Sequence, residues 1–132
     1  MSKKNFFTKR RKMVLELIKN SSVPLSAKKV YSSFKKKMDL ATVYRILQYL
    51  ELNSFIDSFT IVCTKEGTVR YFYAKNNPHN HWFHCTSCHT FLPVKCFKDK
   101  LKSMVTNTES LKGALIHNHI IYFTGICSKC NI

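Results

Sequence analysis

The first half of the chain contains three stretches in which apolar residues recur at helical spacing. A first helix, capped by Thr8, is expected to run to about Asn20. A second helix, capped by Ser26, ends at the lysines 35–37, where cations suit the helix dipole. A third covers about 40–52. The residues expected to face inward are Met13, Val14, Leu17 and Ile18, then Ala27, Val30, Tyr31 and Phe34, and finally Leu40, Val43, Leu47 and Leu50.

The pattern changes after these helices. Two runs, 55–63 and 69–74, alternate in the manner of strands, and residues 65–68 between them contain a glycine, which predicts a hairpin. Three helices followed by a hairpin make a winged helix-turn-helix, in which the third helix enters the major groove of DNA. The candidate DNA-contacting residues of that helix are Ala41, Thr42, Tyr44, Arg45 and Gln48. On its own such a face is typical of any solvated helix, so its surroundings decide the interpretation.

Charge favours the DNA-binding interpretation. The 132 residues include 22 Lys and Arg against 7 Asp and Glu, a formal net charge of +15. Residues 1–75 hold 16 of the cations and 5 of the anions, whereas 76–132 hold 6 and 2. The excess lies on the predicted winged helix, where Arg10, Arg11 and the lysines 35–37 are candidates for phosphate contact. We therefore expect double-stranded DNA as a partner.

A polar segment that contains proline, 75–78, marks a domain boundary. We expect a DNA-binding domain over 1–76 and a metal-binding and dimerisation domain over 77–132. No stretch reaches the roughly 18 apolar residues of a membrane span, and the N-terminus lacks the apolar run of a secretory signal. The prediction is a cytoplasmic protein without membrane association, in which cysteines more often bind metal than form disulfides.

Two CxxC pairs distinguish the second half: Cys85 with Cys88, and Cys127 with Cys130. Each pair directs two thiolates at one ion, and two pairs complete a tetrahedral four-cysteine zinc site. Free buried thiols are the alternative. Haem attachment through Cys85, Cys88 and His89 is disfavoured because it leaves the second pair unexplained, and a thioredoxin-like pair because its flanks are strand-like.

An intact subdomain must separate the two pairs, because 38 residues lie between them. The pattern predicts a short helix over 97–105 and a strand over 114–124. In the helix, Phe97, Leu101 and Met104 are expected to face inward.

All six histidines lie in the second half, which indicates a second metal site. Alternation along the predicted strand places His117 and His119 on one face, and His79 and His81 also share a parity. A set rich in histidine and poor in carboxylates favours zinc, nickel or copper, while iron(II) stays open because imidazole tolerates it. The candidates are His79, His81 and His119, with His117, Asp99 and Cys96 as weaker ones.

These motifs together resemble those of a known family. The motif Asp39-Leu-Ala-Thr-Val-Tyr-Arg-Ile-Leu47 looks like the recognition helix of ferric uptake regulator (Fur) proteins. The order His79-x-His81, Cys85-x-x-Cys88, Asn118-His119 and Cys127-x-x-Cys130 is similar to that of their C-terminal half. The resemblance covers about residues 8–130.

The resemblance implies an α+β fold: an N-terminal winged helix-turn-helix domain followed by a small α/β dimerisation domain with a four-cysteine zinc site. It assigns base contacts to Tyr44 and Arg45 and the structural zinc to the four cysteines. Two positions depart from the family pattern. No histidine stands at 23–25, where many members have one, and Pro93 occupies the place of an acidic residue. Substitutes for the missing ligands are Cys96, Asp99, Glu109 and His117.

We therefore predict a metal-responsive transcriptional regulator and not an enzyme. It is expected to be a homodimeric repressor of metal-homeostasis genes that binds an A/T-rich palindromic operator. Its cofactors are one structural Zn2+ per chain and a second, regulatory Zn2+ or Fe2+. The two departures keep an alternative open, a metal-independent DNA-binding protein with only a structural zinc. A zinc hydrolase is disfavoured because neither carboxylate of the second half adjoins a histidine.

Overall fold

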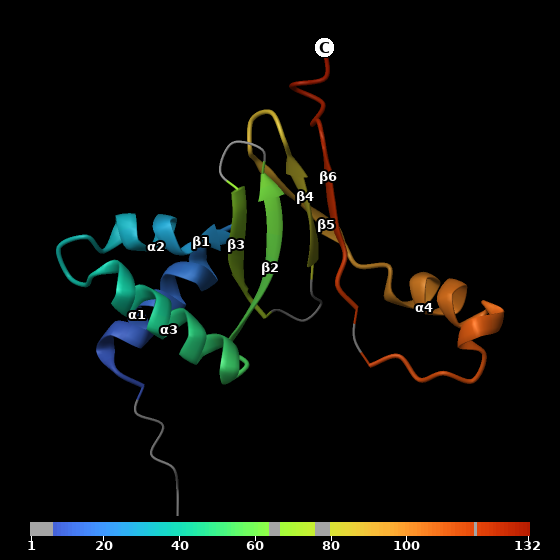
Figure 1. The fold of residues 1–132 in the computed structure, drawn as a ribbon, viewed down its shortest axis with the longest axis horizontal. Helices are drawn as coiled ribbons and strands as arrows, with labels where there is room; N and C mark the ends of the chain where they lie inside the picture. Colours follow the sequence, from blue (N-terminus) through green and yellow to red (C-terminus); the bar gives the residue numbers. More distant parts are fainter. Residues whose placement is uncertain (1–6, 64–66, 76–79, 118) are drawn as a thin grey trace, which may run out of the picture. The chain divides into compact units, whose positions relative to one another are not determined.

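The protein is described by a computed structural model that covers residues 7–63, 67–75, 80–117 and 119–132. It divides into two compact units, unit 1 (Met1–Lys75) and unit 2 (Asn76–Ile132) (Figure 1). The elements of unit 1 are α1 (Lys9–Asn20), β1 (Leu25–Ser26), α2 (Ala27–Ser33), α3 (Leu40–Leu52), β2 (Ile56–Cys63) and β3 (Gly67–Ala74). Those of unit 2 are β4 (Asn80–Cys85), β5 (Phe91–Lys95), α4 (Lys98–Thr106), the 3-10 turn η1 (Glu109–Leu111) and β6 (Tyr122–Gly125).

Side-chain caps set the beginnings of the three helices of unit 1. Thr8 Oγ1 accepts a hydrogen bond from the backbone N–H of the third residue after it at 3.3 Å, and Ser26 Oγ does the same at 3.2 Å. Asp39 Oδ1 caps α3 through the N–H of Thr42 at 2.8 Å. The predicted starts of the helices are confirmed. α2 ends earlier than predicted, because Phe34 leaves the helical conformation before the lysines 35–37.

The helices of unit 1 pack around one apolar core. Its buried residues are Val14, Leu15, Ile18, Leu25, Ala27, Val30, Met38, Val43, Ile46, Leu47, Leu50, Ile56 and Phe72. The inward stripe predicted for α1 was partly wrong, since Leu15 is buried while Met13 and Leu17 are only half-buried. In α3, Ile46 is buried and Leu40 half-buried. Both shifts follow from a core face wider than the strict three-to-four spacing.

The sheet of unit 1 has the strand order β1-β3-β2 and is antiparallel throughout. β1 was not predicted, because it depends on the pairing of Leu25 with Phe72, and these residues lie far apart in the chain. Phe72 faces the helical core, whereas Phe59 on the other face of the hairpin packs its ring against Tyr71 and Tyr73, with centroids 6.1 and 5.8 Å apart. Of the hairpin turn predicted at 65–68, residues 65 and 66 lie outside the described residues, and Gly67 and Thr68 already belong to β3.

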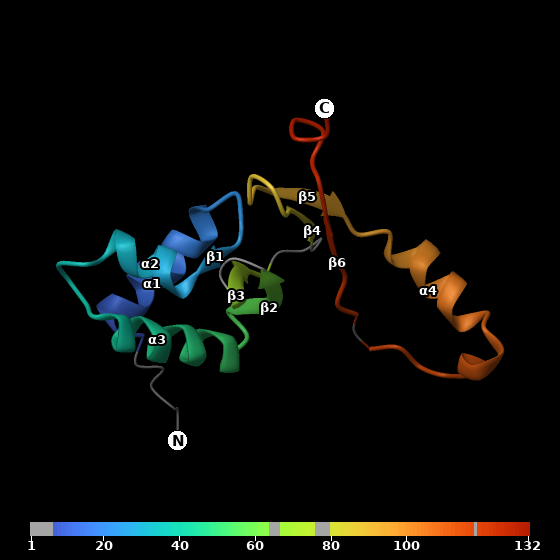
Figure 2. The ribbon, with the colours of Figure 1, turned by 45° about the horizontal axis from the view of Figure 1, so that its top comes forward.

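In unit 2 the described strands form a mixed sheet of order β5-β4-β6, which Figure 2 shows beside α4. β4 is antiparallel to β5 and parallel to β6, with Trp82 opposite Tyr122 and Cys85 opposite Gly125. The strand predicted over 114–124 is largely wrong, since β6 begins at Tyr122. The register explains why: β4 begins at Asn80, so residues much before 120 have no neighbour in this sheet.

The predicted short helix is confirmed as α4, but its inward face is not. Phe97 is 48% exposed and Met104 71% exposed, because α4 does not lie on the sheet of its own unit. Like the other described helices, α4 is not long and apolar enough to cross a membrane.

Candidate metal centres and nucleic-acid interface

Four cysteines meet at one end of the sheet of unit 2. Cys85 is the last residue of β4, and Cys88 lies in the turn that leads to β5. Because β6 runs parallel to β4, both strands end at the same edge, and the chain delivers Cys127 and Cys130 just beyond it. The four sulfur atoms lie within 4.8 Å of one another, and the Sγ atoms of Cys88 and Cys127 are 3.8 Å apart.

Tight turns shape both pairs. In the first, the N–H of His89 donates to the carbonyl of Cys85 at 2.9 Å, and His89 adopts a left-handed φ of 61°. In the second, the N–H of Cys130 donates to the carbonyl of Cys127 at 3.0 Å. Gly125 precedes this turn, and a Cβ there would lie 3.3 Å from the ring of Phe83.

The surrounding hydrogen bonds favour thiolates at two positions. Backbone N–H groups of Cys127 and Cys88 donate to Cys85 Sγ at 3.4 and 3.5 Å, and they lower the pKa of Cys85 to about 6. The hydroxyl of Thr90, 3.2 Å from Cys88 Sγ, lowers the pKa of Cys88. The neighbouring Cys127 sulfur raises the pKa of Cys130 to about 11. Thiolate is the form that binds metal, and four sulfurs at this spacing suit zinc.

A second group of ligand atoms lies at the opposite end of the same sheet. His81 is near the start of β4, Cys96 directly follows β5, and His119 comes before β6. The Nε2 atoms of the two histidines are 2.9 Å apart, and Cys96 Sγ is 3.4 Å from Nε2 of His119. The three ligand atoms lie within 4.8 Å of one another.

The orientation of His81 is set by the backbone. Its Nδ1 lies 3.1 Å from the carbonyl oxygen of Ile121, and its side chain is 6% exposed. When Nδ1 carries the proton and donates it to this carbonyl, Nε2 keeps its lone pair for a metal ion. Two imidazole nitrogens and one sulfur therefore converge in a geometry that fits a divalent cation.

The structure does not bring every predicted ligand to these groups. His117 and Asp99 are exposed and belong to neither group. The segment before β6 is not a strand, so His117 does not share a strand face with His119 as predicted. His79 lies outside the described residues. Cys96, a weaker candidate, joins the second group; its place directly after a strand that pairs with β4 was the missed signal. His84, which had no predicted role, is buried with its ring 4.8 Å from that of Phe91.

In unit 1, α3 presents its predicted face to solvent. Ala41, Tyr44, Arg45 and Gln48 are exposed, with Tyr44 at 51%, and Thr42 is half-buried. A hollow of about 270 Å³ is lined by Tyr44, Arg45, Gln48, Glu51, Arg70 and Phe72. The last two of these residues come from the sheet, so α3 and β3 present one surface.

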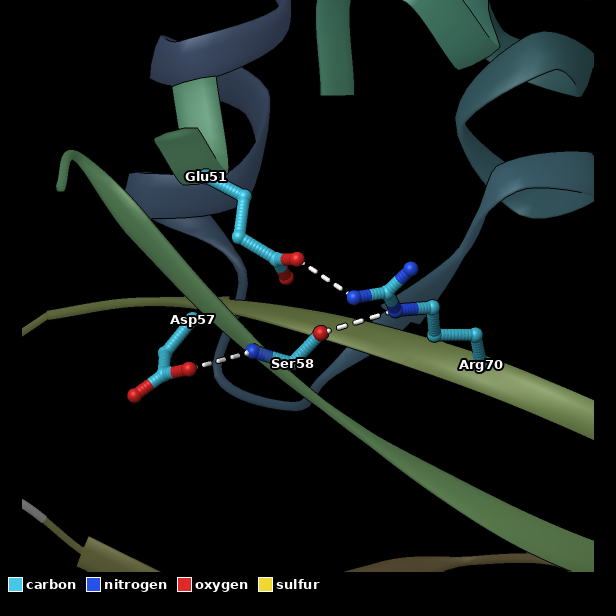
Figure 3. A network of polar contacts seen from close by, with 4 residues as sticks. All are labelled: Glu51, Asp57, Ser58 and Arg70. Carbon is cyan, nitrogen blue, oxygen red and sulfur yellow. Dashed lines mark hydrogen bonds and ion pairs between the residues drawn. The ribbon is translucent and has the colours of Figure 1, made fainter. Parts of the chain in front are cut away.

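Arg70 fastens β3 to α3 (Figure 3). Its guanidinium forms an ion pair with Glu51 and donates from Nε to Ser58 Oγ at 2.9 Å. The N–H of Ser58 in turn donates to Asp57 Oδ1 at 2.9 Å. A larger groove of about 640 Å³ shares Tyr44, Arg70 and Phe72 with the hollow described above. Lys28 and Lys29 also line this groove. Residues of α2, α3 and β3 therefore line one groove, and two lysines of α2 are among them.

The two predicted phosphate-contacting arginines of α1 differ. Arg10 is exposed, whereas Arg11 is half-buried with its guanidinium 3.6 Å from the ring centroid of Tyr49. This cation–π contact ties α1 to α3. Of the two, Arg10 is the more accessible to a ligand.

Comparisons with known proteins agree with this geometry. A family profile described as the ferric uptake regulator family matches residues 4–124. A search of curated proteins finds no match. The structure of the Helicobacter pylori ferric uptake regulator Fur, described with three functional metal-binding sites, is 22% identical with a TM-score of 0.72, over 94% of this chain and 83% of that chain.

Two further structures are similar. The Francisella tularensis ferric uptake regulator with iron is 21% identical with a TM-score of 0.73, over 95% of this chain and 93% of that chain. A zinc uptake regulator complexed with zinc and DNA is 17% identical with a TM-score of 0.60, over 94% of this chain and 82% of that chain. These likenesses confirm the predicted α+β fold with a winged helix-turn-helix. With the two ligand groups, the family match confirms the predicted cofactors, zinc and a second divalent metal ion.

Proposed function

The chain belongs to the ferric uptake regulator family, and on that premise we propose that it is a metal-dependent repressor of metal-homeostasis genes. It binds an A/T-rich palindromic operator as a homodimer when its second metal site is filled. Such a protein acts on DNA rather than as an enzyme, and its expected compartment is the cytoplasm.

DNA recognition is assigned to α3. Tyr44 and Arg45 stand exposed on this helix and supply contacts to base edges, with Ala41, Thr42 and Gln48 beside them. Arg10, Arg11 and the lysines of unit 1 neutralise phosphates and hold the helix in register. This assignment is supported by the shared surface of α3 and β3, which keeps the β2–β3 hairpin at a fixed place next to the helix.

Dimerisation is assigned to unit 2. Exposed apolar side chains recur along the chain from the start of α4 to just after β6: Phe97, Met104, Leu115, Ile120, Tyr122, Phe123 and Ile126. An apolar surface of this kind is typical of an interface with another protein. A second copy of the chain covers it in our proposal, and the same twofold symmetry then matches the two halves of a palindromic operator.

The two ligand groups have different tasks. Cys85, Cys88, Cys127 and Cys130 hold a structural zinc ion that fastens the ends of β4 and β6. His81, Cys96 and His119 hold the regulatory metal. A bound divalent ion supplies positive charge and fixed coordination there. The residues themselves join the start of β4 to the segments that follow β5 and precede β6, so occupancy fixes how these segments run.

The observation that carries the proposal is the second ligand group, separate from the four-cysteine group, on a chain whose other unit is a basic winged helix. The test is metal analysis of the purified protein before and after mild chelation, with a DNA shift assay on each sample. Two metals per chain are expected at first and one afterwards, with DNA affinity lost together with the second metal. Arg45→Ala should abolish the shift of the protein with both metals bound.

The alternative makes a different prediction. If the protein is a metal-independent DNA-binding protein, one zinc per chain is found under all conditions. Operator binding then stays the same after chelation, and this result would refute the switch while leaving the DNA-binding assignment intact.

A further inference from the structure

We propose that Cys96 makes the second ligand group selective for zinc over iron(II) and manganese(II). The inference rests on the proposed function only in treating this group as the regulatory site. The preference itself is a property of the donor atoms and is measured without DNA.

The donor set carries the first part of the inference. Among the described residues, the group consists of two imidazole nitrogens and one sulfur, with no carboxylate. Asp99 on α4 and Glu109 on η1 are both exposed and outside it. Two histidines with one carboxylate form the ligand set typical of non-haem iron(II), and manganese(II) prefers oxygen ligands. Exchanging the carboxylate for a thiolate moves the preference towards softer ions, of which zinc is the most common in proteins.

The geometry carries the second part. The three ligand atoms are drawn close, within 4.8 Å, and His81 is held in place by the carbonyl of Ile121. This arrangement suits the four-coordinate geometry of zinc, whose bonds to nitrogen and sulfur are about 2.0 to 2.3 Å long. Four-coordinate zinc needs one ligand beyond these three residues, whereas the octahedral shell of manganese(II) needs three more.

The position of Cys96 is fixed, and its sulfur lies next to a ligand atom, so this residue can determine the metal preference of the site. It follows Lys95, which pairs with Asn80 at the start of β4, so its position is fixed by the sheet. Its sulfur lies 3.4 Å from Nε2 of His119, the same atom that faces His81. A change of donor at this one position therefore changes the site without moving the histidines.

The experiment uses the full chain with its four-cysteine group filled with zinc, which metal analysis verifies as one ion per chain. Zn2+, Fe2+ under anaerobic conditions and Mn2+ are then titrated separately into the second site. Wild-type protein is expected to bind zinc more tightly than either of the others. Cys96→Asp, which restores a carboxylate, should narrow the ratio of zinc to iron affinity by about tenfold or more.

Cobalt(II) gives an independent readout. Added to the zinc-filled wild type, it should produce the near-ultraviolet sulfur-to-cobalt charge-transfer band, and Cys96→Ser should remove that band. A band that persists in Cys96→Ser, while metal analysis still finds one zinc per chain, would mean that Cys96 is not a ligand. His117→Ala is the matched control, since His117 is exposed two residues before His119 and should leave band and affinities unchanged.

Three results would overturn the inference: iron(II) binding as tightly as zinc in the wild type, an unchanged ratio in Cys96→Asp, or no charge-transfer band. Zinc binds most protein sites more tightly than iron(II) or manganese(II), so the change in the ratio on Cys96→Asp, rather than the wild-type order alone, measures the effect of Cys96. Cys96→Ser supplies a second variant where Cys96→Asp fails to fold. Failure of the proposed function looks different, because the site would still select zinc while DNA binding ignored it.

Discussion

The two units bury different kinds of side chain. Unit 1 buries a continuous set of aliphatic and aromatic residues contributed by three helices and a sheet. Among the described residues of unit 2, those classed as buried are Phe91, Cys85, Cys127, His81 and His84. Apolar packing therefore stabilises unit 1, whereas most of the buried side chains of unit 2 are potential metal ligands. A unit this small gains too little from apolar burial alone, and a metal site supplies what is missing.

The chain offers a separate probe for each unit. Trp82 is the one tryptophan of the sequence and lies on β4 of unit 2. Most of the helical residues belong to α1, α2 and α3 of unit 1. Tryptophan fluorescence therefore follows unit 2, and helical ellipticity mainly follows unit 1.

Removal of the structural metal is expected to have the largest effect and to separate the two units most clearly. Cys127→Ser, or strong chelation with a reductant, is expected to unfold unit 2, because binding free energy at a structural zinc site is on the order of 10 kcal/mol. The fluorescence of Trp82 should become that of an exposed indole while helical ellipticity is largely kept. Loss of both signals together would show that unit 1 depends on unit 2, contrary to the contrast between their cores.

Leu47→Ala is the reciprocal change. Leu47 is fully buried in α3, and its truncation should lower the free energy of unfolding of unit 1 by about 2–5 kcal/mol. Urea titrations should show an earlier transition in ellipticity and an unchanged one in fluorescence. Leu52→Ala is the matched control, since Leu52 lies in the same helix and is 76% exposed. An equal effect of the two variants would contradict the core assignment.

The ion pair between Arg70 and Glu51 is expected to make a smaller contribution to the stability of unit 1. The side chains are 56% and 26% exposed, so the pair is expected to contribute about 0.2–1 kcal/mol. A double-mutant cycle of Arg70→Ala and Glu51→Ala measures this coupling by urea unfolding. The coupling should shrink as salt is added, because exposed charges are screened. A coupling that ignores salt would show that the contact acts through packing instead.

The smallest effect concerns acid stability. The hydrogen bonds that Thr42 gives to the Asp39 cap hold the pKa of Asp39 below its ordinary value of 3.8. The lowered pKa means that the carboxylate stabilises the fold above pH 3.8 and that this contribution disappears as the pH falls through the folded-state pKa. Asp39→Asn keeps a cap without the charge, so its stability relative to wild type should improve towards low pH. A difference in stability between the two proteins that does not change with pH would contradict this assignment.

Sequence patterns predicted the features that depend on residues close together in the chain. Thr8 and Ser26 mark helix starts through hydrogen bonds to residues three positions away, so their effect is readable in sequence. The pairing of Leu25 with Phe72 was not readable, because it joins residues far apart in the chain. The same limit applies to the metal sites. The CxxC spacing revealed the first group, whereas the choice of Cys96 over His117 depends on which strand ends meet.

The parallel pairing of β4 and β6 has a consequence for the order of assembly. The alignment that sets Cys85 opposite Gly125 also sets the carbonyl of Ile121 beside His81, four residues back along β4. Zinc at the cysteines closes a chain loop, and with it the histidines arrive as near neighbours rather than as distant parts of a coil. We therefore expect the ion at the four cysteines to bind first and the ion at His81, Cys96 and His119 to bind second.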